Sequence, residues 1–192
     1  MAFANRRRGR DCSHEVCCKL TVIYVTGHGF SISKILAKYR PWDEVDKQFI
    51  KWFRIPSEQY KRIDNDSPLF STLKTFTAFT ISALPVSKQV VSEIHQEVAT
   101  AVKKCGCNGI NTIVIAHSHG AKCVQEAFRS FTGNPGEMRN LYNKVSILTF
   151  GATCLIDKQM VKVTRNFFFV NDNVFNICHW QQISEERYNM VQ

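Results

Sequence analysis

A serine between a predicted strand and a predicted helix is the residue of this sequence best placed to do chemistry. Ser118 has His117 and His119 on either side and two small residues, Ala116 and Gly120, two positions away. A serine on a tight strand-to-helix turn exposes its hydroxyl, and such a turn needs small residues at these two positions. The pattern predicts a nucleophilic serine. It also fits a helix N-cap, in which the serine only satisfies backbone N–H groups.

Alternating strands and helices have to position this serine. Buried strands are predicted from short apolar runs rich in β-branched and aromatic residues, and helices from apolar residues three and four positions apart. This alternation predicts an α/β fold with a mostly parallel sheet and helices on both faces, in which functional groups collect at the carboxyl ends of the strands. The predicted strands are Lys19–Val25, Asn111–Ala116, Val145–Phe150 and Asn166–Val170, and the predicted helices are Ser31–Tyr39, Trp42–Phe53, Ser87–Lys104 and Gly120–Phe131.

The middle of the chain is less regular, and the role of residues 41–84 stays open. Ser57–Pro68 is polar and is predicted to be a loop. Leu69–Leu84 is rich in Phe, Thr and Ile and fits either a strand or a mobile apolar flap, because its periodicity does not decide. Such a segment is a candidate acyl-chain or lid surface, and equally an ordinary edge strand.

Four segments in chain order resemble the α/β-hydrolase superfamily, in particular its lipase-like branch. Ala116–Gly120 resembles the nucleophile turn G-x-S-x-G, with alanine for the first glycine, and Thr26–Phe30 resembles the His-Gly oxyanion loop. Thr149–Ala152 resembles the strand and turn after the nucleophile helix, and Asn171–Val174 the segment that carries the acid. The resemblance extends in outline over residues 20–174.

The resemblance implies a role for each site residue. Ser118 is then the nucleophile, Asp172 the acid and His179 the base, since the family order is serine, acid, histidine. The backbone N–H groups of His119 and Phe30 are expected to form the oxyanion hole.

Several alternatives remain open for these roles. His28 and Gly29 belong to the possible oxyanion loop or to an ordinary turn. Asp157 is an alternative acid. The chain after Asp172 is short for this family, so His28 or His119 is an alternative base, and a site without any base is also open.

Composition and charge restrict the class of protein. A chain of 192 residues with 44% hydrophobic and 21% charged residues is ordinary for a globular protein, and residues 19–192 are predicted to form one domain. The net charge is +9, and arginines are concentrated in residues 1–18, which are predicted to be a flexible basic arm. An anionic membrane surface is a possible contact of that arm, and nucleic acid is not favoured as a partner. The arginines are Arg6, Arg7, Arg8 and Arg10.

Targeting signals and cofactor motifs are not found in the sequence. The charged stretch Asp11–Lys19 does not fit a signal peptide, and Leu69–Val86 is too polar to span a bilayer. A soluble protein of the cytoplasm or another reducing compartment is expected, with its eight cysteines reduced. Cys123, Cys154 and Cys178 are predicted to lie in the core. The cysteine spacing does not suit zinc, and motifs for nucleotides are missing, so no metal and no cofactor are expected.

Two functions from different classes follow. The first is a serine hydrolase that cleaves an ester or lipid substrate through an acyl-enzyme at Ser118. The alternative is a catalytically degenerate fold of the same type that acts as a binding or interaction module.

Overall fold

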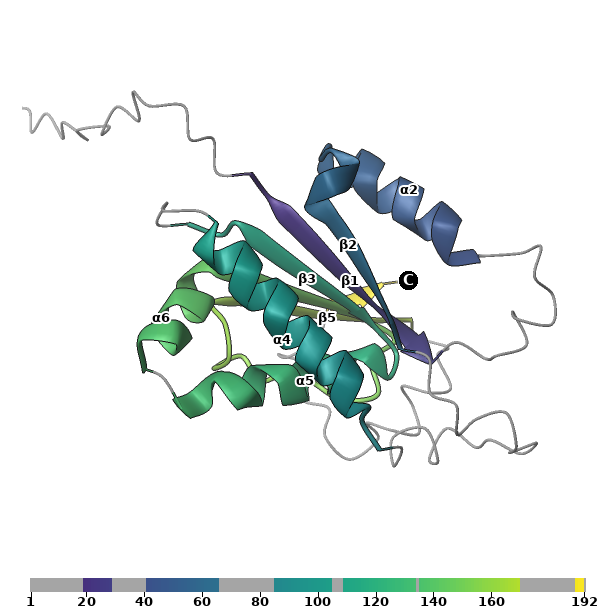
Figure 1. The fold of residues 1–192 in the computed structure, drawn as a ribbon. Helices are drawn as coiled ribbons and strands as arrows, with labels where there is room; N and C mark the ends of the chain where they lie inside the picture. The colour runs from purple at the N-terminus through teal and green to yellow at the C-terminus, as the bar shows by residue number, and fades with distance from the viewer. Residues whose placement is uncertain are drawn as a thin grey trace, which may run out of the picture.

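The centre of the molecule is a twisted parallel sheet (Figure 1). The computed structural model of the chain describes residues 19–28, 41–65, 85–104, 109–133, 135–169 and 189–191. Within these residues six strands form one sheet in the order β2-β1-β3-β4-β5-β6, and every neighbouring pair is parallel. The strands are β1 (Thr21–His28), β2 (Tyr60–Asn65), β3 (Thr112–His117), β4 (Val145–Phe150), β5 (Val163–Phe169) and β6 (Asn189–Val191).

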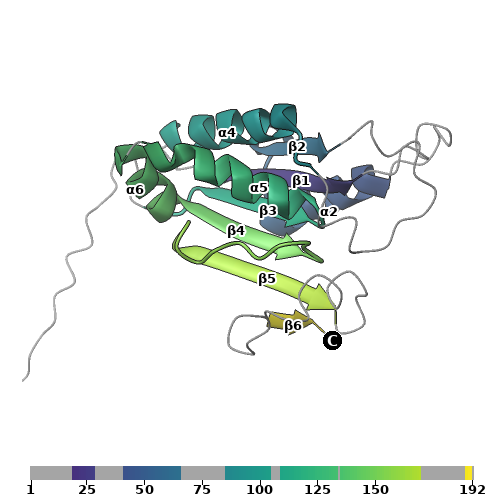
Figure 2. The ribbon, with the colours of Figure 1, turned by 90° about the horizontal axis from the view of Figure 1, so that it is seen from below.

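Helices lie on both faces of this sheet (Figures 1 and 2). One face packs against α2, where Phe49 contacts Tyr24 with ring centroids 5.1 Å apart. The other face packs against α4, α5 and α6, which contribute Val98, Phe128 and Leu141 to the larger core. The helices are α2 (Pro41–Phe53), α4 (Lys88–Lys103), α5 (Gly120–Arg129) and α6 (Pro135–Lys144), with 3-10 turns η1 (Ser57–Gln59) and η3 (Ser130–Gly133).

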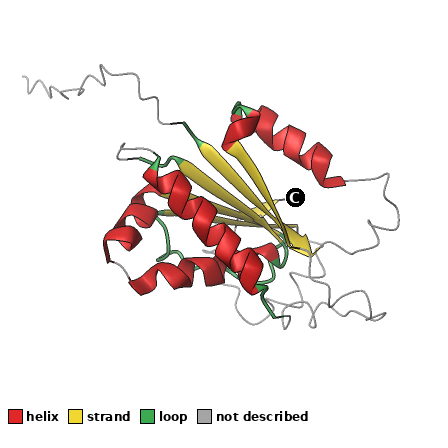
Figure 3. Ribbon diagram, viewed as in Figure 1, coloured by secondary structure: helices red, strands yellow, loops and turns green. Residues whose placement is uncertain are grey.

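The predicted fold class is confirmed. Parallel strands need a crossover between them, and the described part of the chain passes through helices on its way from β1 to β4 (Figure 3). The four predicted strands correspond to β1, β3, β4 and β5, and the predicted helix Ser87–Lys104 corresponds to α4 with Ser87 as its N-cap. None of the described helices is long and apolar enough to cross a bilayer.

The prediction of a polar loop over Ser57–Pro68 is wrong for residues 60–65, which form the edge strand β2. The polar side chains of this strand, which interrupt any apolar pattern, bind residues on neighbouring helices. Arg62 binds Asp43 and Asp46 of α2 at 2.9 and 2.6 Å, and Lys61 binds Glu97 of α4 at 3.4 Å. Because ion pairs to α2 and α4 neutralise its charged side chains, β2 can form without the apolar run from which strands are predicted.

Other expectations fall partly or wholly outside the described residues. The predicted helix Ser31–Tyr39, the segment Leu69–Leu84 and the basic arm 1–18 lie outside them. Trp52 of α2 is 69% exposed, although its ring centroid lies 5.8 Å from that of Phe49, which contacts the sheet. Helix α6 was not predicted; it follows a Gly-Asn pair and has proline as its first residue, a position that tolerates it.

The predicted core position of Cys123 is confirmed. Its side chain is fully buried in α5, and Cys154 packs against the same core, whereas Cys178 lies outside the described residues. Burial raises the pKa of the Cys123 thiol from 9.0 to about 12, and nearby Cys154 adds to this shift.

Removing Arg62 should destabilise the protein more than removing an exposed arginine. Arg62→Ala leaves three carboxylates around α2 and β2 without their shared cation, and we expect the free energy of unfolding to fall by about 2 kcal/mol. Arg129→Ala removes an exposed pair with Glu126 and should cost about 0.5 kcal/mol or less. Urea denaturation of both variants measures the difference, and equal losses would contradict the structural role of Arg62.

The Cys123 thiol should make stability depend on alkaline pH. The folded protein holds this proton up to about pH 12, but the unfolded chain releases it near pH 9, so unfolding releases a proton between these values. Stability therefore falls as pH rises above 9, by about 1.4 kcal/mol per pH unit for one proton. Cys123→Ala should be less stable at neutral pH yet lose stability more slowly from pH 9 to 10.5. The free energy of unfolding is measured by urea denaturation at each pH, and an equal fall with pH in the two proteins would contradict the assignment of the shift to Cys123.

Candidate functional site

The carboxyl ends of β1 and β3 meet at the point where the strand order reverses. The chain moves outward from β1 to β2 at one edge, then crosses back to β3 on the other side of β1. In open parallel sheets, ligands bind beyond the carboxyl ends of the strands at such a reversal. Ser118 directly follows β3 at this position.

The backbone of Ser118 has the conformation of a tight turn. Its φ angle is +51°, and Arg54 is the other non-glycine residue with positive φ in the described part of the chain. This left-handed conformation costs about 1–3 kcal/mol for a residue with a side chain, so the surroundings must hold it. The Ser118 N–H donates to the Phe150 carbonyl at 3.0 Å, and its carbonyl accepts from Ala121 and Thr153 at 3.2 and 3.3 Å. Strand β4, the loop that follows it and helix α5 thus hold the strained residue.

Two glycines let the strand ends and the helix approach this turn. A Cβ on Gly120 would lie 2.6 Å from the Thr26 carbonyl oxygen and 2.7 Å from that of Val25, both in β1. A Cβ on Gly27 would lie 2.9 Å from Cβ of Ser118. Neither position has room for a side chain, so the small residue at Gly120 has a steric cause, as the nucleophile-turn pattern requires.

Strand β1 is irregular beside the serine. Its register with β2 shifts between Val25, which pairs with Ile63, and His28, which pairs with Asn65. The shift inserts one extra residue into β1, and Gly27 lies in the insertion. Such bulges often re-aim the chain at a functional site.

His119 lies in the interior rather than at the surface. It is fully buried, and its Nδ1 lies 3.1 Å from Nδ2 of Asn65 and 3.9 Å from Sγ of Cys123. The Asn65 N–H in turn donates to Oγ1 of Thr26 at 3.0 Å. A buried polar group without a partner would cost about 1–3 kcal/mol, and this group of four side chains avoids that cost for the imidazole. We call Thr26, Asn65, His119 and Cys123 the buried polar cluster.

The position of the buried polar cluster bears on the choice of catalytic base. The imidazole of His119 is held inside by Asn65, so its position does not favour His119 as the alternative base. Its backbone, in contrast, forms the N-cap of α5 next to Ser118. This is where the resemblance places an oxyanion-binding N–H.

Several predicted site residues lie outside the described part of the chain. These are Gly29, Phe30, Asp172 and His179. His28 ends β1, but only its backbone is described. Asp157, the alternative acid, lies in an exposed turn between β4 and β5, where its Oδ1 accepts from the Gln159 N–H at 2.8 Å.

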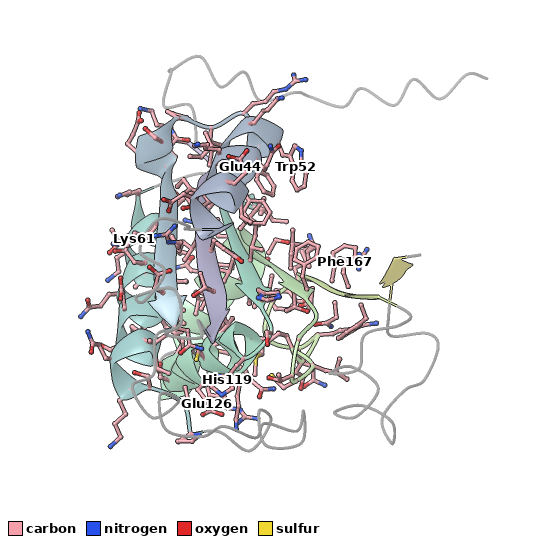
Figure 4. The ribbon with its side chains drawn as sticks, turned by 90° about the vertical axis from the view of Figure 1, so that its right-hand side faces the viewer. Glu44, Trp52, Lys61, His119, Glu126 and Phe167 are labelled. Atoms are coloured by element: carbon pink, nitrogen blue, oxygen red, sulfur yellow. The ribbon has the colours of Figure 1, made fainter. Side chains whose placement is uncertain are left out.

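A groove on the helix layer is lined by described residues other than Ser118 and His119. It has a volume of about 460 Å³ and lies between the first half of α4 and the end of α5, lined by Val91, His95, Glu126 and Ser130 among others. None of its lining residues belongs to the turn around Ser118. The large exposed Trp52 is likewise remote, at the opposite end of the molecule from His119 in Figure 4.

Asn65 is the residue of this site that the sequence does not reveal. It belongs to β2, the strand that the sequence predicts as a loop, so no apolar pattern marks it as buried. The Thr26–Phe30 segment does predict a functional loop after β1, but it carries no information about the neighbouring strand.

Gly120→Ala tests the close contact between α5 and β1. The added methyl group would meet two backbone carbonyls that cannot turn aside, and we expect the free energy of unfolding to fall by about 1–3 kcal/mol. Gly109→Ala is the matched control, because nothing lies within 4 Å of its Cβ and the change should stay within about 0.5 kcal/mol. Both values come from urea denaturation, and an unchanged Gly120→Ala would contradict the steric account.

Comparisons with known proteins do not identify a relative of this chain. The chain matches no protein-family model, no curated protein and no solved structure. The parallel α/β sheet is compatible with the α/β-hydrolase fold, and the assignment to a function depends on the residues themselves.

Proposed function

We propose that the protein is a serine hydrolase of the α/β-hydrolase type that cleaves a carboxylic or lipid ester through an acyl-enzyme at Ser118. The observation that carries the proposal is the left-handed backbone of Ser118, at +51°, between β3 and α5 at the reversal of strand order. A plain N-cap serine has extended backbone angles, so a cap alone gives no reason for this conformation.

The proposed reaction has two steps. The Ser118 hydroxyl oxygen attacks the ester carbonyl carbon, a base takes the hydroxyl proton, and the alcohol leaves with that proton. Water then attacks the acyl-enzyme, and the proton taken from the water returns to the serine oxygen as the carboxylic acid leaves. We propose His179 as the base and Asp172 as the carboxylate that orients it, both from the resemblance.

Negative charge forms on the former carbonyl oxygen in each step. Two backbone N–H groups, those of His119 and Phe30, are proposed to bind it. Loss of one such donor typically slows the reaction by a factor on the order of 10²–10³. The first turn of α5 directs its N–H groups toward its N-terminus, which also favours negative charge there.

Covalent labelling with a fluorophosphonate tests the proposal directly. This probe reacts with serines that a base activates, so we expect one label per wild-type chain and none in Ser118→Ala. His179→Ala should be labelled more slowly by a factor on the order of 10²–10⁴, the usual contribution of a general base. Intact mass with peptide mapping identifies the labelled residue.

Ser130 provides a matched control for this labelling. Its Oγ lies 2.7 Å from Nδ1 of His95, so it also contacts a histidine, but it donates its own proton to the Ala127 carbonyl at 2.6 Å. Ser130→Ala should therefore be labelled like the wild type. A folded wild type that takes up no label would overturn the proposal and favour the non-catalytic interaction module instead.

A further inference from the structure

A buried contact links the edge strand β2 to the residue after the proposed nucleophile. Asn65 is 1% exposed and His119 is 0% exposed, and Nδ2 of the amide lies 3.1 Å from Nδ1 of the imidazole. An apolar pair would fill the same space without desolvating two polar groups. Packing alone therefore does not account for a polar pair at this position.

The contact involves one particular nitrogen of the ring. Nδ1 of His119 faces the Asn65 amide, and whether this nitrogen donates or accepts the hydrogen bond depends on the tautomer of the ring. Asn65 is itself anchored, because its backbone N–H donates to Oγ1 of Thr26 in β1. The imidazole is thus linked to β2 directly through Asn65, and to β1 indirectly through the contact of Asn65 with Thr26.

The same residue is the N-cap of α5, directly before its first residue Gly120. His119 has φ and ψ of −63° and −18°, and its side chain makes no capping hydrogen bond to the helix. A backbone donor stabilises a developing oxyanion only if it already points at the right place, because reorientation during the reaction costs part of the gain. Because Asn65 holds the His119 ring, rotation of the peptide between Ser118 and His119, which carries the His119 N–H, is restricted.

We propose that Asn65 is a positioning residue, which holds His119 so that its N–H faces the oxyanion formed at Ser118. This inference rests on the proposed hydrolase function and adds to it a residue from a strand outside the nucleophile turn. Asn65 acts through His119 and does not touch the substrate.

The first test removes the contact while keeping the volume. Asn65→Leu should lower the maximal rate of labelling by the fluorophosphonate about 10- to 100-fold, less than or equal to the loss of a whole donor, with the half-saturating probe concentration unchanged. Asn166→Leu is the matched control. Asn166 is also a buried asparagine on a strand, accepts from Oγ1 of Thr149 at 2.7 Å, and lies on β5, two strands from β3. It should lose stability but keep the wild-type rate.

Variants of His119 test the same contact from the other side. His119→Asn places a carbonyl oxygen near the position of Nδ1 and should retain most of the rate, whereas His119→Leu should lose as much as Asn65→Leu. The double variant Asn65→Leu/His119→Leu should lose no more than either single variant, because all three remove one interaction. If Asn65→Leu does not fold, the His119→Asn and His119→Leu pair decides the question.

Nitrogen NMR of the imidazole gives a readout that needs no activity. Asn65→Leu should shift the Nδ1 signal of His119 relative to the wild type, because it removes the amide that contacts this nitrogen. An Nδ1 signal that Asn65→Leu leaves unchanged, or a folded Asn65→Leu labelled at the wild-type rate, would overturn the inference. A wild type that is never labelled would instead overturn the proposed function, so the two failures are distinguishable.

Discussion

The contact between the first turn of α5 and the backbone of β1 is the constraint on which the site depends. Gly120 lies against the carbonyls of Val25 and Thr26 with no room for a side chain, so the turn before it has to be tight. A tight turn places Ser118 in a left-handed conformation, which hydrogen bonds from β4 and α5 then hold. The close approach of α5 to β1 therefore goes together with the left-handed turn at Ser118, a residue that is partly exposed.

The parts of the fold that the sequence predicts are those whose stability comes from burial of apolar runs. Strands β1, β3, β4 and the core of β5 are continuous apolar segments because a parallel strand is covered on both faces. Helix α4 is predicted because its buried residues, such as Ile94 and Val98, repeat with helical spacing. The turn at Ser118 is predicted for a similar reason, since its small neighbours are required by sterics rather than by long-range contacts.

Strand β2 and helix α6 were not predicted because long-range polar contacts and helix-end chemistry stabilise them. In β2, Ile63 is the one apolar side chain that the structure buries. The charges of Lys61 and Arg62 are compensated mostly by residues 16 to 36 positions away, and Asp64 is a nearby partner of Arg62. Helix α6 buries only Leu141 among its described side chains. No local pattern carries such information. Asp172 and His179 lie outside the described residues, so their proposed roles depend on the resemblance alone.

The electrostatics of the edge strand and the geometry of the site are connected through strand register. Successive side chains of β2 face opposite sides: Arg62 binds α2, while Ile63 and Asn65 face the side covered by α4 and α5. A slip of one residue would put Arg62 into the apolar core and carry the amide of Asn65 away from His119. The ion pairs of Arg62 with Asp43 and Asp46 oppose that slip. Asp43 and Asp46 of α2, far from Ser118 in sequence, thereby help to keep Asn65 in contact with His119, whose backbone N–H is the proposed oxyanion donor.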